Sequence, residues 1–479
     1  MYKMKEAVFI LKVLILWCCF TPNVIAQRIL VRPYLQPGNV SDLKKEQKVL
    51  IWQTDSVPGN FTVTYNLYGS ESNMEEAKPS VVQLHIKNRT TFLYRAILTK
   101  LQFDTLYHYE VRLKNNIVAR DSFRTRTTKP FTRFAVLGDF GAGTSQQAAI
   151  AYRMAEQKPQ FVITTGDNAY QNGLDEEYRS NVFPYYLPQE NAPAKGAALM
   201  NTIPFYMVLG NHDVRIDSLG KAPGAFAYFY YNDLPLNGPT VQYAPIIKGT
   251  GAQVKAFKKN TKPRFPKMAN FSFDNGNVHF TCLDANDYTN PLDASLLQWL
   301  QRDIGNSRAD WKVVVFHHPG FNSSKAHYDF QLMRLLAPSF EKLGVNLVLT
   351  GHVHNYQRSV PLTFKPEINE AGDRYIISPE GRVNGTFALD TLYDGVTRTK
   401  PNGIIYIVTG AGGGGLYDPQ LSKKPETWSH DVPDNWVPFT KQLISDRHSF
   451  TLIETNQKEL TLKQIDLTGK ILDEIKISQ

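Results

Sequence analysis

Cysteine is almost absent from this chain of 479 residues, which contains only three. Cys18 and Cys19 lie in the first apolar segment, so a chain that loses this segment keeps only Cys282 and can form no internal disulfide. This excludes the small, disulfide-stapled class of secreted scaffolds. With 42% hydrophobic and 20% charged residues, the sequence instead predicts a soluble globular protein of two or three domains.

The N-terminal apolar run is too short to span a membrane, which needs about 20 residues. Residues 7–20 are interrupted by Lys12 and preceded by two lysines, and residues 24–26 form a small-residue cleavage pattern. Residues 1–26 are therefore predicted to be a secretory signal peptide rather than a membrane anchor. We expect a secreted or periplasmic protein, with no membrane span after signal cleavage and no lipid anchor. An exported chain of this size without disulfides is typical of a bacterial periplasm or exterior.

Acidic residues are missing from residues 254–267, VKAFKKNTKPRFPK, the densest basic stretch of the chain. Loss of the signal removes three lysines and one glutamate, which lowers the formal net charge from +9 to +7. A basic surface favours anionic substrates. Because no pattern of stacking aromatics accompanies the basic stretch, it is interpreted as a solvated loop. Neither a nucleic acid nor a partner protein is expected.

Two common catalytic motifs are missing as well. The chain has no G-x-S-x-G nucleophile elbow, and the glycine run VTGAGGGGL, residues 408–416, is not followed by the lysine and hydroxyl of a P-loop. These absences argue against a serine hydrolase and a P-loop nucleotide-binding protein. The glycine run is interpreted instead as a close backbone approach beside a site.

Among the features that are present, β-strand patterns come first. Residues 27–128 hold the short alternating runs KVLIWQT, FTVTYNLYG, TFLYRAIL, LYHYEVRL and DSFRTRT, with no helical pattern between them. This predicts an antiparallel, all-β sandwich. Trp52 and residues 107–109 resemble the core positions of fibronectin type III domains, and we expect them to pack rather than to take part in chemistry.

Residues 129–479 have a different pattern, in which near-continuous apolar strands alternate with helices. This predicts an α/β domain whose strands are buried on both faces. A hairpin is expected at Asn275-Gly276, and a β meander over residues 450–478 is expected to complete the domain. The predicted helices are SQQAAIAYRMAEQ, capped by Thr144 or Ser145, DASLLQWLQRDI, capped by Asp293, and DFQLMRLLAPSFEKLG.

Side chains of the kinds that bind metals follow five of these strands. They are Asp139 after FAVLG, Asp167 and Tyr170 after FVITTG, Asn211, His212 and Asp213 after FYMVLG, His317 and His318 after VVVF, and His352 and His354 after LVLTG. Ligands of open α/β sheets bind beyond the carboxyl ends of the strands, so these groups should converge. Together they suit two cations, with Asp167 as a bridging carboxylate.

Each of these residues also has a purely structural explanation. A Gly-Asp pair after a strand is commonly a turn, a lone histidine is more often a hydrogen-bonded structural residue, and Asn211 could cap a loop. The occurrence of donors at five strand ends, in order along the chain, favours the metal site over these separate explanations.

The motifs D-x-G, G-D-x-x-Y, G-N-H-D, V-x-x-H and G-H-x-H follow one another in this order. They resemble the five-block signature of the purple acid phosphatases. These enzymes are the branch of the calcineurin-like metallophosphoesterases that carries a sandwich domain ahead of the catalytic one. The resemblance covers nearly the whole mature chain and implies that residues 129–479 form a mixed-sheet α/β sandwich.

The resemblance also implies a set of metal ligands. Fe(III) would bind Asp139, Asp167, Tyr170 and His354, and a divalent Fe, Zn or Mn ion would bind Asp167, Asn211, His317 and His352. Most metallophosphoesterases have a histidine two residues after the first aspartate, where this chain has Gly141. Tyr170 replaces that ligand, and its phenolate favours a ferric ion. His317 is chosen over His318 for its spacing from Val314 and the proline two residues later.

The resemblance places two further histidines, His212 and His327, beside the substrate, and Asp213 would orient His212. It implies an acid phosphatase acting on small phosphate monoesters, in which a metal-bound hydroxide attacks phosphorus and a histidine protonates the leaving alcohol. The alternatives are a metallophosphodiesterase or nucleotidase with the same site, or a surface binding protein without turnover. All seven metal-binding residues are present, which disfavours the binding protein.

Overall fold

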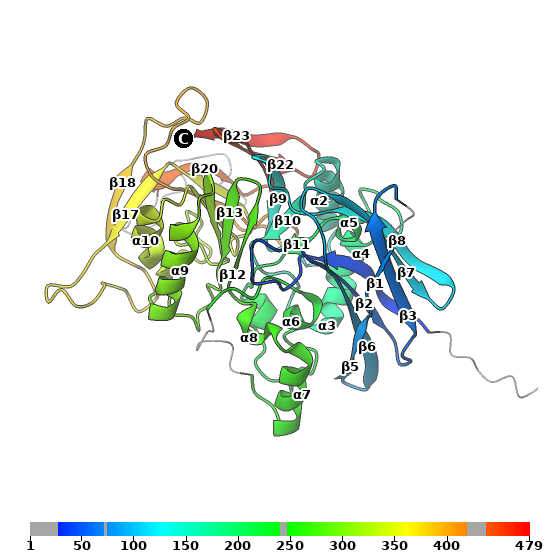
Figure 1. Ribbon diagram of the computed structural model, residues 1–479. Helices are drawn as coiled ribbons and strands as arrows, with labels where there is room; N and C mark the ends of the chain where they lie inside the picture. Colours follow the sequence, from blue (N-terminus) through cyan, green and yellow to red (C-terminus); the bar gives the residue numbers. More distant parts are fainter. Residues whose placement is uncertain (1–26, 71–73, 240–246, 419–436) are drawn as a thin grey trace, which may run out of the picture.

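The computed structural model describes residues 27–70, 74–239, 247–418 and 437–479 (Figure 1). The predicted signal peptide, residues 1–26, lies outside the described residues. Within the described ranges, no helix combines the length and the apolar character that crossing a membrane requires.

The N-terminal part folds into two antiparallel four-stranded sheets, ordered β1-β2-β6-β5 and β4-β3-β7-β8 (Figure 1). The strands are β1 (Ile29–Gln36), β2 (Lys48–Thr54), β3 (Phe61–Leu67), β4 (Glu75–Glu76), β5 (Ser80–Ile86), β6 (Arg89–Leu98), β7 (Leu106–Leu113) and β8 (Asn116–Arg124). Trp52 is fully buried, stacks on Tyr94 at 5.2 Å and meets Phe61 of the other sheet at 5.2 Å. The predicted all-β sandwich is confirmed, and its aromatic residues fill the core.

The rest of the chain builds two larger mixed sheets, ordered β11-β10-β9-β21-β22-β23 and β12-β13-β14-β15-β19-β16-β20, and a small sheet of β17 and β18. Strands β9, β10 and β11 run parallel, as do β13, β14, β15 and β19. The strands are β9 (Thr132–Leu137), β10 (Phe161–Thr164), β11 (Phe205–Tyr206), β12 (Phe271–Asn275), β13 (Val278–Cys282), β14 (Trp311–Val315), β15 (Leu347–Thr350), β16 (Tyr356–Ser359), β17 (Leu362–Pro366), β18 (Gly385–Leu389), β19 (Ile405–Thr409), β20 (Thr440–Ile444), β21 (Ser449–Thr455), β22 (Glu459–Asp466) and β23 (Ile471–Ser478). The predicted mixed-sheet α/β sandwich is confirmed.

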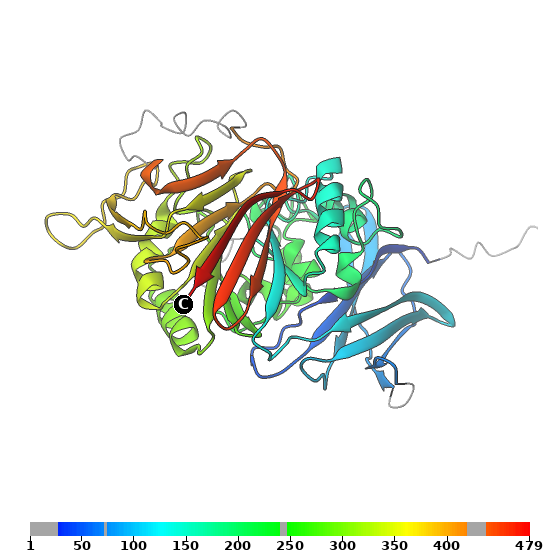
Figure 2. The same cartoon turned by 90° about the horizontal axis from the view of Figure 1, so that it is seen from above.

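Two local predictions for these sheets also agree with the structure. Strands β12 and β13 form the hairpin expected at Asn275-Gly276. The C-terminal meander joins the first large sheet, because β21 pairs antiparallel with β9 (Figure 2).

Helices lie between and outside the strands, and three of them fall where the sequence predicts them. The helical segments, with 3₁₀ and π turns marked η, are α2 (Ser145–Glu156), α3 (Asp175–Glu177), η1 (Tyr178–Val182), α4 (Phe183–Tyr186), α5 (Leu199–Thr202), η2 (His212–Val214), α6 (Tyr228–Tyr231), α7 (Gly251–Thr261), α8 (Arg264–Lys267), α9 (Ala294–Asn306), η3 (Leu332–Leu336), α10 (Ala337–Lys342) and η6 (Val437–Phe439). Thr144 caps α2 and Asp293 caps α9 through backbone N–H groups. The third predicted helix divides into η3 and α10, with a proline in the first turn of α10.

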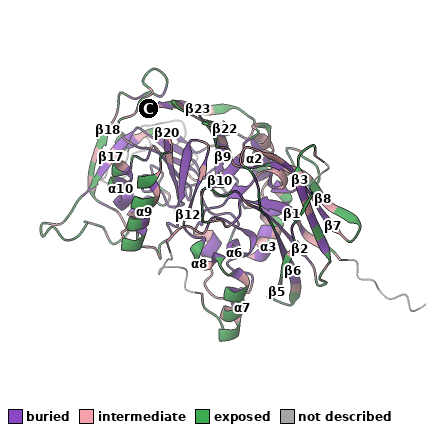
Figure 3. Cartoon of the chain, in the orientation of Figure 1, coloured by how far each residue is buried: buried purple, intermediate pink, exposed green. Residues whose placement is uncertain are grey.

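The prediction of a solvated loop at residues 254–267 is wrong, because these residues form α7 and α8. Thr250 and Gln253 make a capping box that satisfies the first N–H groups of α7. Phe257 is buried against Phe226 and Phe265, so this lysine-rich helix is anchored by one apolar residue. Figure 3 shows its outer surface as exposed.

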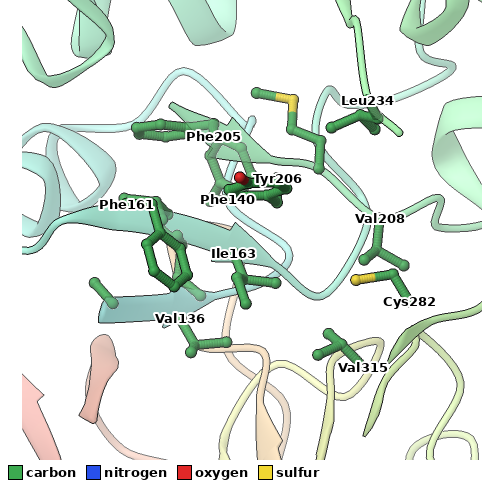
Figure 4. Packing of buried hydrophobic residues seen from close by; sticks show 14 of the residues in the cluster. Val136, Phe140, Phe161, Ile163, Phe205, Tyr206, Val208, Leu234, Cys282 and Val315 are labelled. Atoms are coloured by element: carbon green, nitrogen blue, oxygen red, sulfur yellow. The ribbon is translucent and has the colours of Figure 1, made fainter. Parts of the chain in front are cut away.

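Buried hydrophobic side chains from the two large sheets pack together, and aromatic rings such as Phe161 and Tyr206 lie among them (Figure 4). Phe161 of one sheet meets Phe273 of the other at 5.7 Å, and Phe134 meets Phe280 at 5.0 Å, both edge to face. Cys282 is fully buried in this layer, and burial raises the pKa of its thiol well above the usual range. It therefore acts as a packing residue.

A buried polar interface joins the sandwich to the α/β part. The Arg95 guanidinium of β6 lies 2.6 Å from one carboxylate oxygen of Asp233, and that of Arg264 lies 3.5 Å from the other. The Tyr34 hydroxyl of β1 donates a hydrogen bond to the Tyr231 carbonyl at 2.6 Å. Each charged group is buried, so each relies on the others to replace water.

His279 of β13 is a buried imidazole held between two carboxylates, with Nδ1 2.7 Å from Asp274 Oδ1 and Nε2 3.0 Å from Asp303 Oδ2. Burial alone would lower its pKa, but the hydrogen bonds that the ring donates to these carboxylates raise it to about 9. Because the folded-state pKa lies above the unfolded one, the stabilisation is complete below about pH 6.5 and is lost as the pH rises through 9.

We expect His279→Gln to lower the free energy of unfolding by about 3 kcal/mol at pH 6 and by much less at pH 10. Urea denaturation at the two pH values measures this difference. His85→Gln, at an exposed position of β5, is the matched control and should change little. An equal loss for His279→Gln at both pH values would contradict a protonated imidazole in the folded state.

Candidate metal centre

The predicted metal donors gather where the parallel strands of the two large sheets end. Asp139 lies two residues beyond β9, Asp167 three beyond β10, His317 two beyond β14 and His352 two beyond β15. Ligand atoms of Asp139, Asp167 and His317 all lie within 4.8 Å of one another, and all three residues are buried.

Tyr170 is at the centre of the first group of donors. Its hydroxyl lies 3.2 Å from Asp139 Oδ1, 3.2 Å from Asp167 Oδ2 and 2.9 Å from His354 Nε2. His354 Nε2 is in turn 3.5 Å from Asp139 Oδ1. The structure thus brings together the four side chains predicted for the first metal.

His317 is at the centre of the second group. Its Nε2 lies 2.9 Å from Asn211 Oδ1, 3.2 Å from His352 Nδ1 and 3.4 Å from Asp167 Oδ2. Asp167 Oδ2 therefore belongs to both groups, which is the position a bridging carboxylate needs. The structure brings these four side chains together as well.

Backbone carbonyls orient two of the imidazoles. His317 Nδ1 lies 2.8 Å from the Thr165 carbonyl oxygen, and His354 Nδ1 is hydrogen-bonded to the Gly415 carbonyl. In a neutral imidazole, an N–H donated to a carbonyl leaves the opposite ring nitrogen unprotonated and able to bind a metal. In both residues that opposite nitrogen faces the cluster.

The backbone around the cluster is tightly constrained. Asp139, Asp167 and His352 have φ values of 58°, 51° and 67°, a left-handed region that costs non-glycine residues about 1 kcal/mol or more and occurs often at functional sites. A Cβ on Gly410 would lie 2.7 Å from Asp139 Oδ2, and one on Gly414 would lie 2.9 Å from His354 Cε1. The glycine run therefore approaches the cluster closely, as the sequence predicts.

Gly141 occupies the place of the missing histidine, and no side chain fits there. A Cβ at this position would lie 1.9 Å from the Asn168 carbonyl oxygen. The Tyr170 N–H donates a hydrogen bond to the Gly141 carbonyl at 2.8 Å. The tight turn that excludes a histidine is therefore also the turn that holds Tyr170.

Two buried carboxylates face each other in this cluster. Burial raises the pKa of Asp139 well above its usual range, and the charge of Asp167 adds to this, although His317 opposes it. Burial would raise the pKa of Asp167 too, but the charge of His317 holds it below the usual range. Two buried acids, a buried phenol and several imidazoles are costly to bury together without a cation. A metal ion would let the inward imidazole nitrogens lose their protons and act as ligands. The donor set therefore fits a metal centre.

His212 lies beside this centre, but Asp213 does not orient it, and that prediction is wrong. His212 Nδ1 is 2.7 Å from the Gln171 carbonyl oxygen, and its Nε2 is 3.9 Å from Asp167 Oδ2. The fully buried Asp213 carboxylate instead accepts hydrogen bonds from Asn168 and from the Gly210 N–H. Successive residues of the short η2 turn point in different directions, which adjacency in sequence does not reveal.

His327 and His318 both lie next to His352. The ring centroid of His327, an exposed residue, is 3.9 Å from that of His352, and the distance for the buried His318 is 4.2 Å. His318 also packs on Phe330 at 4.5 Å, and it could form a three-imidazole metal group with His317 and His352. Of His317 and His318, only His317 has a hydrogen bond to Asn211 within the described part of the chain. That bond is on its inward nitrogen, which is the geometry expected of the predicted ligand.

Sequence reasoning missed two residues that contact the proposed donors or the loop beside them. Tyr417 packs on His354, and its only sequence signal is that it directly follows the glycine run. Glu177 accepts hydrogen bonds from the N–H groups of Gln171, Asn172 and Leu174 at 2.7–2.9 Å. It thereby shapes the loop whose Gln171 carbonyl holds His212.

We expect Glu177→Ala to lower kcat/KM for a phosphate ester by about tenfold, because three backbone donors lose their acceptor and His212 loses its fixed position. Steady-state kinetics with the purified protein measures the effect. Glu176→Ala is the matched control, since Glu176 is paired with Lys87 at the exposed surface and such pairs contribute little. Equal effects of the two substitutions would contradict a role for Glu177 at the site.

The fold and the donor set define a metallophosphoesterase-type domain, and residues 132–356 match the family model of the calcineurin-like phosphoesterases. Those residues are therefore a calcineurin-like phosphoesterase domain. The chain is 29% identical to purple acid phosphatase 17 of Arabidopsis thaliana, over 47% of this chain and 62% of that protein. It is 23% identical to a purple acid phosphatase of Glycine max, over 66% of this chain and 64% of that protein. The predicted resemblance to the purple acid phosphatases is confirmed, and the chain spans less than two thirds of the length of these two relatives.

Solved structures show the same fold. A purple acid phosphatase, PPD1, from yellow lupin (Lupinus luteus) seeds superimposes with a TM-score of 0.58 at 15% identity, covering 93% of this chain and 74% of that one. A structure of PhoD superimposes with a TM-score of 0.55 at 15% identity, covering 95% and 94%. At this identity the likeness concerns the fold alone.

Proposed function

We propose that this protein is an exported acid phosphatase that hydrolyses small phosphate monoesters at a two-metal centre. The observation that supports this best is the sharing of Asp167 Oδ2 between the Tyr170 group and the His317 group. One carboxylate oxygen that faces two complete donor sets suits a bridged pair of cations.

The same donor sets suggest which metals bind. Tyr170 supplies an anionic phenolate when it binds a metal, which favours Fe(III), whereas the neutral amide and imidazoles of the second group suit a divalent Fe, Zn or Mn ion. The holding residues would be Asp139, Asp167, Tyr170 and His354 for the first metal, and Asp167, Asn211, His317 and His352 for the second. When bound, the metals would offset the charge of the phosphoryl oxygens and lower the pKa of a water molecule.

The chain's own residues then have distinct tasks. As an imidazolium, His212 would keep its Nδ1–H on the Gln171 carbonyl and use its Nε2–H to donate a hydrogen bond to a phosphoryl oxygen. His327, exposed beside His352, would give its proton to the oxygen of the leaving alcohol. No side chain is required as a nucleophile.

The proposal is tested by measuring hydrolysis of one aryl phosphomonoester and the matching diester from pH 4 to pH 9. Monoester turnover that is fastest below pH 7 is the expected result. Turnover confined to the diester would keep the metal centre and make the substrate assignment wrong. A protein that binds metal and hydrolyses neither ester would overturn the assignment as a phosphatase.

A further inference from the structure

Helix α7 and the residue that ends it carry four exposed lysines on one side. Their spacing of i, i+3, i+4 and i+7 aligns them along a single face of a helix. We call this surface the lysine face, and its residues are Lys255, Lys258, Lys259 and Lys262. The buried residues of the helix, Phe257 and Thr261, point away from this face and toward the body of the protein.

The lysine face is a concentration of charge that the chain does not balance. Lysines three or four residues apart on a helix are neighbours, and like charges at these spacings destabilise the helix. Among the described residues, none of the four forms an ion pair. The sequence has no acidic residue from position 234 to 273, and no described residue that lines the cleft between α7 and β5 is acidic.

The helix dipole explains only part of this arrangement. It favours a cation in the last turn of α7, where Lys258 and Lys259 lie, but it does not explain why the same face begins one turn earlier with Lys255. Four adjacent cations without an internal acid suit an anionic partner outside the chain.

The shape of this region indicates what kind of partner fits. Figure 1 shows α7 projecting from the body of the molecule, and Figure 3 shows its outer surface as exposed. The helix is held from its inner side, where the Phe257 ring lies 5.5 Å from that of Tyr230 and the Asn260 side chain donates a hydrogen bond to the Gln83 carbonyl at 3.3 Å. A projecting, convex helix can touch a flat anionic surface, whereas a polymer chain is usually bound in a groove.

The kind of cation supports the same conclusion. The exposed cations of the face are all lysines, while the Arg264 guanidinium of the next helix is buried beside Asp233. An ammonium group attracts phosphate as a point charge, without the fixed two-bond geometry of a guanidinium. The face therefore suits many loosely ordered phosphates better than one phosphate in a defined position.

We propose that the lysine face docks this protein on an anionic lipid surface by attraction to the headgroups. Phe257, the buried aromatic residue of α7, packs against the body, so the contact is electrostatic and inserts no aromatic ring into the bilayer. Each lysine close to such a surface strengthens binding about fivefold. None of the four is a proposed metal donor, so this docking is independent of the proposed phosphatase function.

Co-sedimentation of the purified protein with lipid vesicles tests the proposal. The protein should bind vesicles of phosphatidylcholine and phosphatidylglycerol in equal parts, bind pure phosphatidylcholine vesicles weakly, and dissociate as the salt concentration rises. The partition coefficient should fall about fivefold in Lys259→Gln, and by at least about a hundredfold when all four lysines are changed to glutamine. Glutamine favours helices and removes the repulsion, so thermal unfolding of that variant should occur at the parent temperature or above.

An equal loss of charge elsewhere on the protein is the matched control. Four exposed lysines from separate segments are changed to glutamine, namely Lys44, Lys78, Lys129 and Lys365. This variant has the same net charge as the variant without the lysine face, and its partition coefficient should stay within about twofold of the parent value. An equal loss of vesicle binding in both variants would mean that net charge alone drives binding, and would overturn the proposal.

Two anionic polymers serve as competitors for the same surface. Duplex DNA and polygalacturonate, each added at the same concentration of negative charge as the vesicles, should leave the protein on the lipid. Release by either polymer would assign the lysine face to a polymer and overturn the lipid assignment. Failure of the parent protein to bind the anionic vesicles at low salt would overturn it as well. Ester hydrolysis by the variants is measured separately and should equal that of the parent, so the docking and the phosphatase assignment can fail independently.

Discussion

Asp167→Asn is expected to lower kcat for a phosphomonoester by about a thousandfold or more. Asp167 Oδ2 faces both donor groups, and an amide cannot supply the charge of a bridging carboxylate. A loss of about 4 kcal/mol of transition-state stabilisation corresponds to that factor. Metal analysis of the purified variant should also show both metals reduced, since each donor group loses a ligand.

The matched control is Asp217→Asn, because Asp217 forms an exposed ion pair with Lys248 and lies outside the cluster. It should keep its metals and its rate. A variant of Asp167 that retains both metals and most of its activity would contradict the bridging role. Loss of one metal alone would restrict Asp167 to a single donor group.

Gly141→Ala is expected to destabilise the protein by about 3 kcal/mol and to lower its metal content, although alanine brings only one methyl group. That methyl group would lie 1.9 Å from the Asn168 carbonyl oxygen and 2.8 Å from the Ala169 Cα, so the backbone itself must move. Movement there displaces Tyr170, whose N–H is held by the Gly141 carbonyl. Thermal unfolding, metal analysis and the visible absorption of an iron–phenolate pair measure these effects.

Gly415→Ala is the control for this substitution. A Cβ on Gly415 has no neighbour within 4 Å, although its carbonyl accepts the His354 hydrogen bond. We expect near-normal stability and metal content there. If Gly141→Ala were equally well tolerated, the turn would be more adaptable than the close approach indicates.

The convergence of the proposed metal donors can be predicted from sequence because each follows an apolar strand. In parallel strands, the position of a residue beyond the strand end largely determines which edge of the sheet it occupies, so five runs and their trailing residues indicate one cluster. Capping residues such as Thr144 and Asp293 are equally local signals. The order of sandwich and α/β sheets follows from the change of apolar period near residue 128.

The features that sequence reasoning missed depend on contacts between distant segments. Tyr417 meets His354 only because the glycine run folds back across the strand ends. Glu177 accepts hydrogen bonds from three backbone N–H groups. Every residue except proline has such a group, so the sequence does not indicate these contacts. Helix α7 could not be recognised from its sequence because most of its residues are polar. Its single buried phenylalanine, Phe257, gives no helical period of apolar residues.

The buried interface around Asp233 limits how the β-sandwich domain of this chain can be exchanged for another. Asp233 comes from the α/β part, but one of its two guanidinium partners, Arg95, comes from the sandwich, as does the Tyr34 hydroxyl that donates to Tyr231. The sandwich is therefore not an interchangeable module. If a different β-sandwich were grafted in its place, Asp233 and Arg264 would remain at the domain interface, but Asp233 would lose the guanidinium of Arg95. Chimeric proteins built from this chain should therefore exchange the interface residues of the sandwich and of the α/β part together.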